Sequence, residues 1–108
     1  TSTTLKIIDE LNLQLREENI RLIVLLIPEQ EMVEKGNTNY YGAMPKIIKH
    51  LEESDIGYIN LQPVFKKETD ASKQSLYQGH LKPIGNWIIA REIYDYLDKN
   101  YKNLDKDK

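Results

Sequence analysis

A histidine stands in the most distinctive stretch of this sequence, residues 77–90, which reads YQGHLKPIGNWIIA. His80 precedes a run of apolar residues with helical spacing. A histidine in the loop before a helix can present its imidazole above the carboxyl ends of parallel strands, where open α/β sheets form their ligand crevices. Imidazole exchanges protons near neutral pH, so the position suits a general base. A loop histidine without a catalytic role is the plainer alternative.

The spacing around this histidine resembles the last conserved block of the SGNH (GDSL-type) hydrolases and esterases. In that block leucine or proline follows the histidine, a glycine comes five residues after it, and an alanine five residues later. His80, Leu81, Gly85 and Ala90 match this pattern. Residues 25–33 also look like a strand of that family with its following loop, and residues 56–61 look like its next strand, so the resemblance covers most of the chain.

The resemblance implies a fold, a reaction and a role for His80. The fold would be a three-layer α/β/α arrangement with a parallel sheet, flavodoxin-like, of which this chain is the C-terminal part. His80 would take the proton from a serine hydroxyl during acyl transfer on a small ester or acetylated substrate. The resemblance implies no metal and no organic cofactor.

Two parts of the family's machinery have no match in the sequence. The acidic residue expected two or three positions before the histidine is replaced, because Tyr77 and Gln78 stand there. Gln78 can accept a hydrogen bond and orient the ring, but it cannot supply a negative charge. The family's Gly-Asp-Ser nucleophile block would lie upstream of Thr1, and no serine of this chain has its flanking glycines. We therefore expect the isolated chain to be inactive.

Other candidates for chemistry are fewer. Glu29 and Gln30 follow an apolar run and could line a substrate cleft, although a charged turn after a strand is as often merely solvated. His50 lies among charged residues of a predicted helix and is expected at the surface. We find no spacing typical of metal ligands, no glycine-rich phosphate loop and no internal repeat.

Composition excludes several classes of partner. The 108 residues are 40% hydrophobic and 30% charged, which is typical of one globular domain. With 15 basic and 17 acidic residues the net charge is −2, so we expect neither nucleic acid nor an anionic membrane as partner. The chain has no cysteine, which excludes disulfides and thiolate catalysis but leaves the cellular compartment open.

The pattern of apolar residues predicts helices at residues 3–18, 45–54 and 83–99 and strands at residues 20–28 and 56–61. Helix and strand alternate, which indicates an α/β fold with parallel strands. Between these elements we expect a loop at residues 29–39, with a helical turn at 31–34, and a short helix inside a surface loop at 64–76. Residues 1–99 would form the domain and residues 100–108 a charged, flexible tail.

Two strands are too few for a finished parallel sheet, because both backbone edges stay open. We expect residues upstream of Thr1 or a second copy of the chain to complete it. Two functions remain open: a fragment or divergent member of the SGNH-type ester hydrolases, and a non-catalytic α/β module used for binding or assembly. Gln78, in place of an acid, favours the second.

Overall fold

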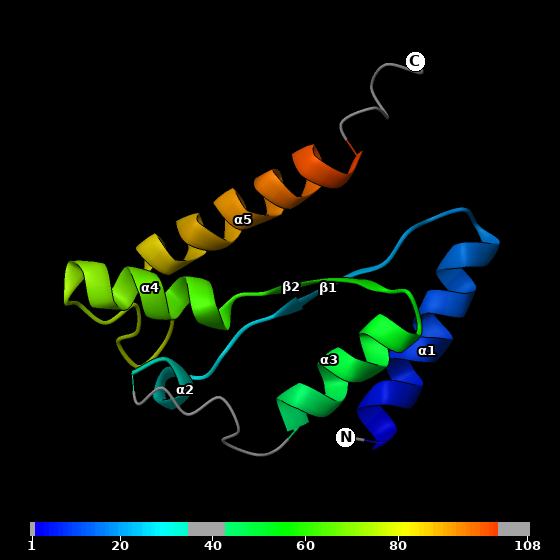
Figure 1. The fold of residues 1–108 in the computed structure, drawn as a ribbon, viewed down its shortest axis with the longest axis horizontal. Helices are drawn as coiled ribbons and strands as arrows, with labels where there is room; N and C mark the ends of the chain where they lie inside the picture. The colour runs from blue at the N-terminus through cyan, green and yellow to red at the C-terminus, as the bar shows by residue number, and fades with distance from the viewer. Residues whose placement is uncertain (1, 35–42, 102–108) are drawn as a thin grey trace.

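The computed structural model describes residues 2–34 and 43–101 of the chain (Figure 1). In order, its elements are α1 (Ser2–Glu17), β1 (Ile23–Leu26), α2 (Gln30–Glu34), α3 (Ala43–Glu53), β2 (Gly57–Asn60), α4 (Gln62–Ser72) and α5 (Pro83–Tyr101). The fold is mixed α/β and mostly helical, with one small sheet in the described part of the chain.

The two strands pair in parallel, as the alternation of helix and strand predicts. Ile23 lies opposite Gly57, and Leu26 lies opposite Asn60. The pairing continues for one further hydrogen bond, from the amide of Leu61 to the carbonyl oxygen of Leu26 at 3.1 Å. Both strands are shorter than the apolar runs that predict them, because Ile20 and Ile56 bond to the ends of the preceding helices and the last residues of each run follow the strand.

Apolar side chains cover both faces of this strand pair. One cluster is centred on Phe65, Leu61 and Ile88 and receives the side chains of Ile23 and Leu25 from β1. The second cluster is made by Leu26, Leu51 and Ile56, with Val24 of β1 packed against it. Alternate residues of β1 thus face opposite clusters, as strand geometry requires. In Figure 1, α5 lies on one side of the strands, and α3 and α1 lie on the other.

The two helices that lead into the strands end in the same way. After α1, Asn19 has a φ of 60° and the amide of Ile20 donates to the carbonyl oxygen of Leu15. After α3, Asp55 has a φ of 55° and the amide of Ile56 donates to the carbonyl oxygen of Leu51. This is the Schellman arrangement, in which a residue in the left-handed region ends a helix and an apolar contact follows it.

These two ends share a sequence pattern, although we expected no internal repeat. Leucine stands at the start of each pattern, asparagine or aspartate four residues later, and isoleucine directly after, in residues 15–20 and again in residues 51–56. Asparagine and aspartate are the residues other than glycine that adopt the left-handed conformation most readily. The pattern therefore marks both places where a helix turns into a strand.

The polar segment after β2 is more helical than its composition suggests. We predict only a short helix within residues 64–76, whereas α4 is an 11-residue helix that begins at Gln62. Pro63 suits its first turn, where a missing amide hydrogen has no consequence. Phe65 is completely buried in the first cluster and Val64 packs beside it, so apolar contacts near its start hold an otherwise polar helix in place.

The ends of two further elements differ by a turn or less from the prediction. The helix α3 begins at Ala43, two residues before the expected start. The helix α5 continues to Tyr101 and takes in the first two residues of the predicted tail 100–108. The rest of that tail lies outside the described residues, as do residues 35–39 of the predicted loop. In the described ranges, no helix combines the length and apolar character needed to cross a bilayer.

Several large apolar side chains lie at the surface. The helix α1 has no buried residue, and its Ile7 and Leu13 are more than half exposed. On α5, Trp87 is 59% exposed and Tyr94 is 69% exposed. Two helices therefore present apolar groups that the described residues leave in contact with solvent.

Candidate functional site

His80 lies in a tight turn between α4 and α5. Tyr77 and Leu81 form an isolated antiparallel bridge across the turn, and the amide of Gln78 donates to the carbonyl oxygen of His80 at 2.7 Å. Gly79 makes the turn possible, because its φ of 73° lies in the region that favours glycine. The side chain of His80 is exposed at this turn.

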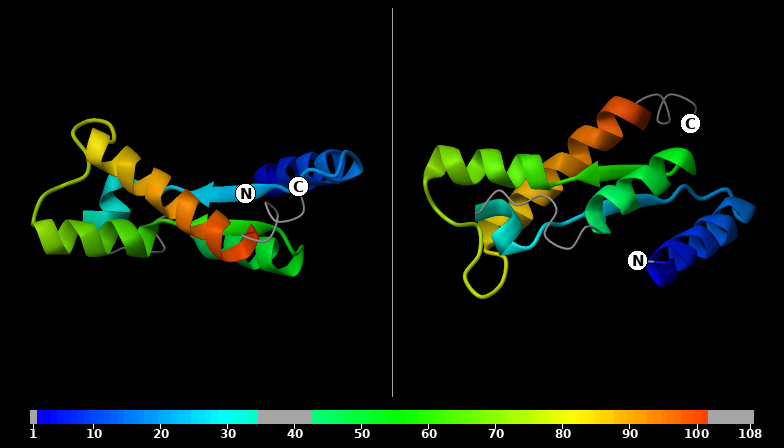
Figure 2. Two further views of the ribbon diagram at one scale, coloured as in Figure 1. Left: turned by 90° about the horizontal axis from the view of Figure 1, so that it is seen from above. Right: turned by 60° about the horizontal axis from the view of Figure 1, so that its bottom comes forward.

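Tyr77 fastens the turn to the end of β1. Its hydroxyl donates a hydrogen bond to the carbonyl oxygen of Pro28, two residues after the strand ends. The ring of Tyr77 also meets the ring of Phe65 edge-on, with centroids 6.3 Å apart. The loop that carries His80 consequently lies beside α2 at the carboxyl end of the strands (Figure 2), the end at which we expected the histidine.

Gln78, the residue in the position of the family's acid, is exposed and meets His80 only through the backbone. Within residues 2–34 and 43–101, no carboxylate forms an ion pair or hydrogen bond with the imidazole of His80. The orienting contact that we expected from the Gln78 side chain is likewise absent from this part of the chain. The turn therefore presents a histidine with no polar partner for its ring among the described side chains.

Glu29 and Gln30 lie at the same end of the sheet and are both exposed. The carbonyl oxygen of Glu29 accepts the amides of Met32 and Val33, so its backbone begins α2. The side-chain amide of Gln30 donates a hydrogen bond to the carboxylate of Glu34 at 3.0 Å. Both residues thus border the loop of His80, and the structure gives both of them a role in forming α2.

Glu34 is the centre of a polar group that the sequence did not indicate. Hydrogen bonding by the side chains of Ser75 and Gln30 lowers the pKa of Glu34. Burial opposes this shift, and the positive charge of Lys82 adds to it. Nearby, burial raises the pKa of Tyr77, and the negative charges of Glu29 and Glu34 raise it further. No spacing in the sequence foretells this group, because its members come from α2, the loop and the start of α5.

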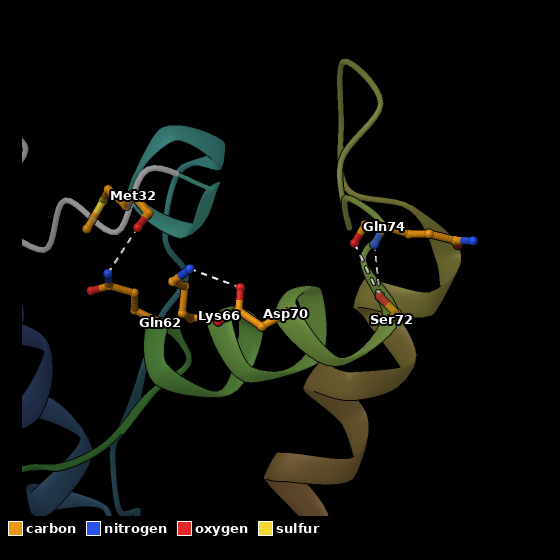
Figure 3. A network of polar contacts seen from close by, with 6 residues as sticks. All are labelled: Met32, Gln62, Lys66, Asp70, Ser72 and Gln74. Carbon is orange, nitrogen blue, oxygen red and sulfur yellow. Dashed lines mark hydrogen bonds and ion pairs between the residues drawn. The ribbon is translucent and has the colours of Figure 1, made fainter.

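A buried amide fixes α2 against α4. Gln62 is only 6% exposed, and its side-chain amide donates to the carbonyl oxygen of Met32 at 3.2 Å (Figure 3). Its backbone amide in turn binds the side-chain oxygen of Asn60. A buried amide left without these partners would cost about 1–3 kcal/mol, so the contact selects one position for α2. Figure 3 also shows Lys66 bridging to Asp70 along α4 at 3.0 Å.

His50 contacts an aspartate and a serine, the residue types of a Ser-His-Asp catalytic triad, but their geometry differs from that of a triad. Its Nε2 atom lies 2.6 Å from Asp9 and 3.5 Å from the hydroxyl of Ser54. A catalytic histidine uses one ring nitrogen for the acid and the other for the nucleophile. Here a single nitrogen faces both groups, so the contact serves to join α1 to α3. We expected His50 to be a surface residue, whereas it is half-buried and its ring contacts Asp9 of α1.

The described ranges 2–34 and 43–101 contain no group of three or more histidine, cysteine, aspartate or glutamate side chains that could hold a metal ion. A scan against protein-family models and searches of curated proteins and of solved structures find no match to this chain. The SGNH resemblance accordingly rests on the residues of this sequence alone.

Proposed function

We propose that this chain is a fragment or a divergent member of an SGNH-type ester hydrolase domain, in which His80 is the general base. The observation that carries the proposal is the attachment of the His80 turn to Pro28, directly after β1. Ligand crevices of parallel sheets lie outside the carboxyl ends of the strands, where this turn lies. The complete fold would be the three-layer, flavodoxin-like α/β/α sheet of that family, with further strands beside β1 and β2.

Acyl transfer requires more than the described residues offer. A serine must reach His80, and hydrogen-bond donors must face the oxyanion of the tetrahedral intermediate. Ser75, the serine nearest to the turn in sequence, accepts a hydrogen bond from the backbone amide of Tyr77 at 3.0 Å and lies beside Glu34, and no hydrogen bond joins it to His80 among the described residues. The nucleophile would therefore come from another segment or another chain, and the substrate would be a small ester or an acetylated compound.

A second candidate is a non-catalytic α/β module for binding or assembly. The absence of a carboxylate partner for His80 among the described residues favours it, because loss of the acid from a serine-protease triad lowers turnover by about ten-thousand-fold. In this case the turn would be a remnant of a site that no longer performs chemistry.

Hydrolysis of p-nitrophenyl acetate separates the two candidates. We expect residues 1–108 to hydrolyse this ester no faster than an exposed imidazole does. Expressed together with any residues that its gene encodes before Thr1, the protein should gain activity if a Gly-Asp-Ser segment is among them. His80→Ala should then abolish the gain, whereas the matched variant His50→Ala should preserve it.

Two results would decide against the hydrolase. A gene without a serine segment before Thr1 would favour the non-catalytic module. Turnover by residues 1–108 that survives His80→Ala would show that another residue is the base and that the nucleophile lies inside the chain.

A further inference from the structure

A cavity of about 650 Å³ lies at the opposite end of the strands from His80. Its wall includes Leu22, which precedes β1, and Ile56 and Gly57, where β2 begins. The ends of α1 and α5 complete it through Asn12 and Tyr101. Small-molecule sites commonly have volumes of about 300–1,000 Å³, so the cavity is large enough for a metabolite.

Two guanidinium groups line this cavity. Arg21 lies over the ring of Tyr101, with its central carbon 5.3 Å from the ring centroid. Arg16 makes one long hydrogen bond, 3.5 Å, to the backbone carbonyl oxygen of Asp55. Neither arginine forms an ion pair with a carboxylate in the described ranges, unlike Arg91, which is paired with Glu68 and Glu92. Both therefore keep their capacity to bind a carboxylate of a ligand.

Negative groups line the same cavity. Asp55 is the one carboxylate of its wall, and it too has no ion pair with any residue in the part of the chain that the structure describes. The helices α1 and α3 both end here, so their negative dipole ends add to this charge. A ligand with charge of one sign alone would leave either the arginines or Asp55 and the helix ends without a partner of opposite charge.

We propose that the cavity binds a zwitterion, an amino acid or a similar small molecule that carries both a carboxylate and an ammonium group. The arginines would hold the carboxylate, and Asp55 with the helix ends would hold the ammonium group. The side-chain amides of Asn12 and Asn19, which also line the cavity, can bind the polar body of the ligand. This site is separate from the proposed hydrolase site and does not depend on it.

Titration of the 108-residue chain with L-glutamine, followed by the amide NMR signals, tests the proposal. The charged groups of the cavity are exposed, so we expect saturable binding with a dissociation constant of about 1 mM. The signals of Gly57 and Asp55 should shift, and those of the His80 turn should not. L-Glutaminamide lacks the carboxylate and N-acetyl-L-glutamine lacks the ammonium group, and each should bind about tenfold more weakly.

Matched variants locate the two halves of the site. Arg21→Gln should weaken L-glutamine binding about tenfold and leave the affinity for L-glutaminamide unchanged. Asp55→Asn should likewise weaken the binding of L-glutamine, and it should leave the affinity for N-acetyl-L-glutamine, which has no ammonium group, unchanged. Asparagine also tolerates the left-handed backbone at residue 55, so this variant keeps the helix end intact. Arg91→Gln, outside the cavity, serves as control and should bind as the unaltered protein does.

The comparison of the three ligands on the unaltered protein does not depend on how any variant folds. Equal affinities for all three, or no saturable shifts with L-glutamine, would overturn the proposal. Equal binding of L-glutamine by Arg21→Gln, Asp55→Asn and the unaltered protein would overturn it as well.

Discussion

The hydroxyl of Tyr77 donates a hydrogen bond to the carbonyl oxygen of Pro28, and this bond joins the loop before α5 to the segment that leaves β1. Pro28 is itself buried, and Tyr77 is half-buried against Phe65. The bond therefore connects two ordered parts of the chain that lie far apart in sequence. Together with the contact of Tyr77 and Phe65, it places the His80 turn at the end of the sheet.

Removal of this hydroxyl should loosen the His80 turn. We expect Tyr77→Phe to lower the free energy of unfolding by about 1 kcal/mol, since it leaves the Pro28 carbonyl without its partner. Thermal denaturation should show a melting temperature several degrees lower, and amide exchange should rise in residues 78–81. The control Tyr94→Phe changes a hydroxyl on a side chain that is 69% exposed and should have no effect. Equal melting temperatures for both variants would contradict the assigned role of Tyr77.

Alkaline pH should destabilise the protein through two tyrosines. Burial raises the pKa of Tyr77, and burial together with Tyr101 raises the pKa of Tyr96. Because the folded-state pKa exceeds the unfolded value of about 10, this contribution to stability is complete below about pH 10. It is lost as the pH rises through the folded-state pKa. Urea denaturation at increasing pH should show the midpoint falling in that range.

The loss at alkaline pH should shrink in Tyr77→Phe and Tyr96→Phe, which have no phenol to ionise at these positions. Tyr94→Phe should retain the full dependence. An unchanged pH dependence in both test variants would mean that other groups, such as lysines, cause the loss.

The packing of α4 should depend on Phe65. This ring is completely buried, and Phe65→Ala should lower the free energy of unfolding by about 3–5 kcal/mol. Small domains are stable by only about 5–15 kcal/mol, so a large part of the helical signal should be lost at 37 °C. Leu97→Ala, at a position that is 42% exposed, should shift the urea midpoint far less. Similar midpoints for the two variants would refute the assignment of Phe65 to the core.

Exposed apolar side chains should make the isolated chain self-associate. Ile84, Trp87 and Tyr94 of α5 are each more than half exposed, and both outer edges of the strand pair are open within the described sheet. Sedimentation should therefore show a mass that grows with concentration, and Trp87→Glu should reduce it. Glu31→Gln, a change on α2, is the control. A single monomeric species at all concentrations would contradict this expectation.

The sequence predicts those elements whose apolar residues repeat at a regular interval. The helix α1, the strand β1 and the helix α5 all follow such patterns, and each is found within a few residues of its predicted range. The helix α4 is underestimated because its buried residues, Gln62 and Phe65, lie in its first turn and do not form a repeated apolar stripe. A search for periodicity detects helices that bury residues along their whole length, and it misses a helix that is anchored only by its first turn.

The surroundings of the candidate sites were less predictable than the elements. The position of His80 in a loop before a helix can be inferred from residues 77–90. The hydrogen bond from Tyr77 to Pro28 cannot be inferred in this way, because the sequence does not show whether the Tyr77 side chain faces solvent or the core. The cavity of Arg16, Arg21 and Tyr101 joins two helices to a strand entrance, and no local pattern indicates which distant residues meet there.

The parallel pairing of β1 with β2 has a consequence for the kinetics of folding. Every hydrogen bond between these strands joins residues that are as far apart in sequence as Ile23 and Gly57. The intervening chain must therefore close into a loop before any of these hydrogen bonds forms. The helices need only local contacts and can form and dissolve much sooner. Until the loop closes, the unpaired backbone of the apolar segment 23–26 is accessible to other molecules along both edges, and the chain is then most prone to aggregate.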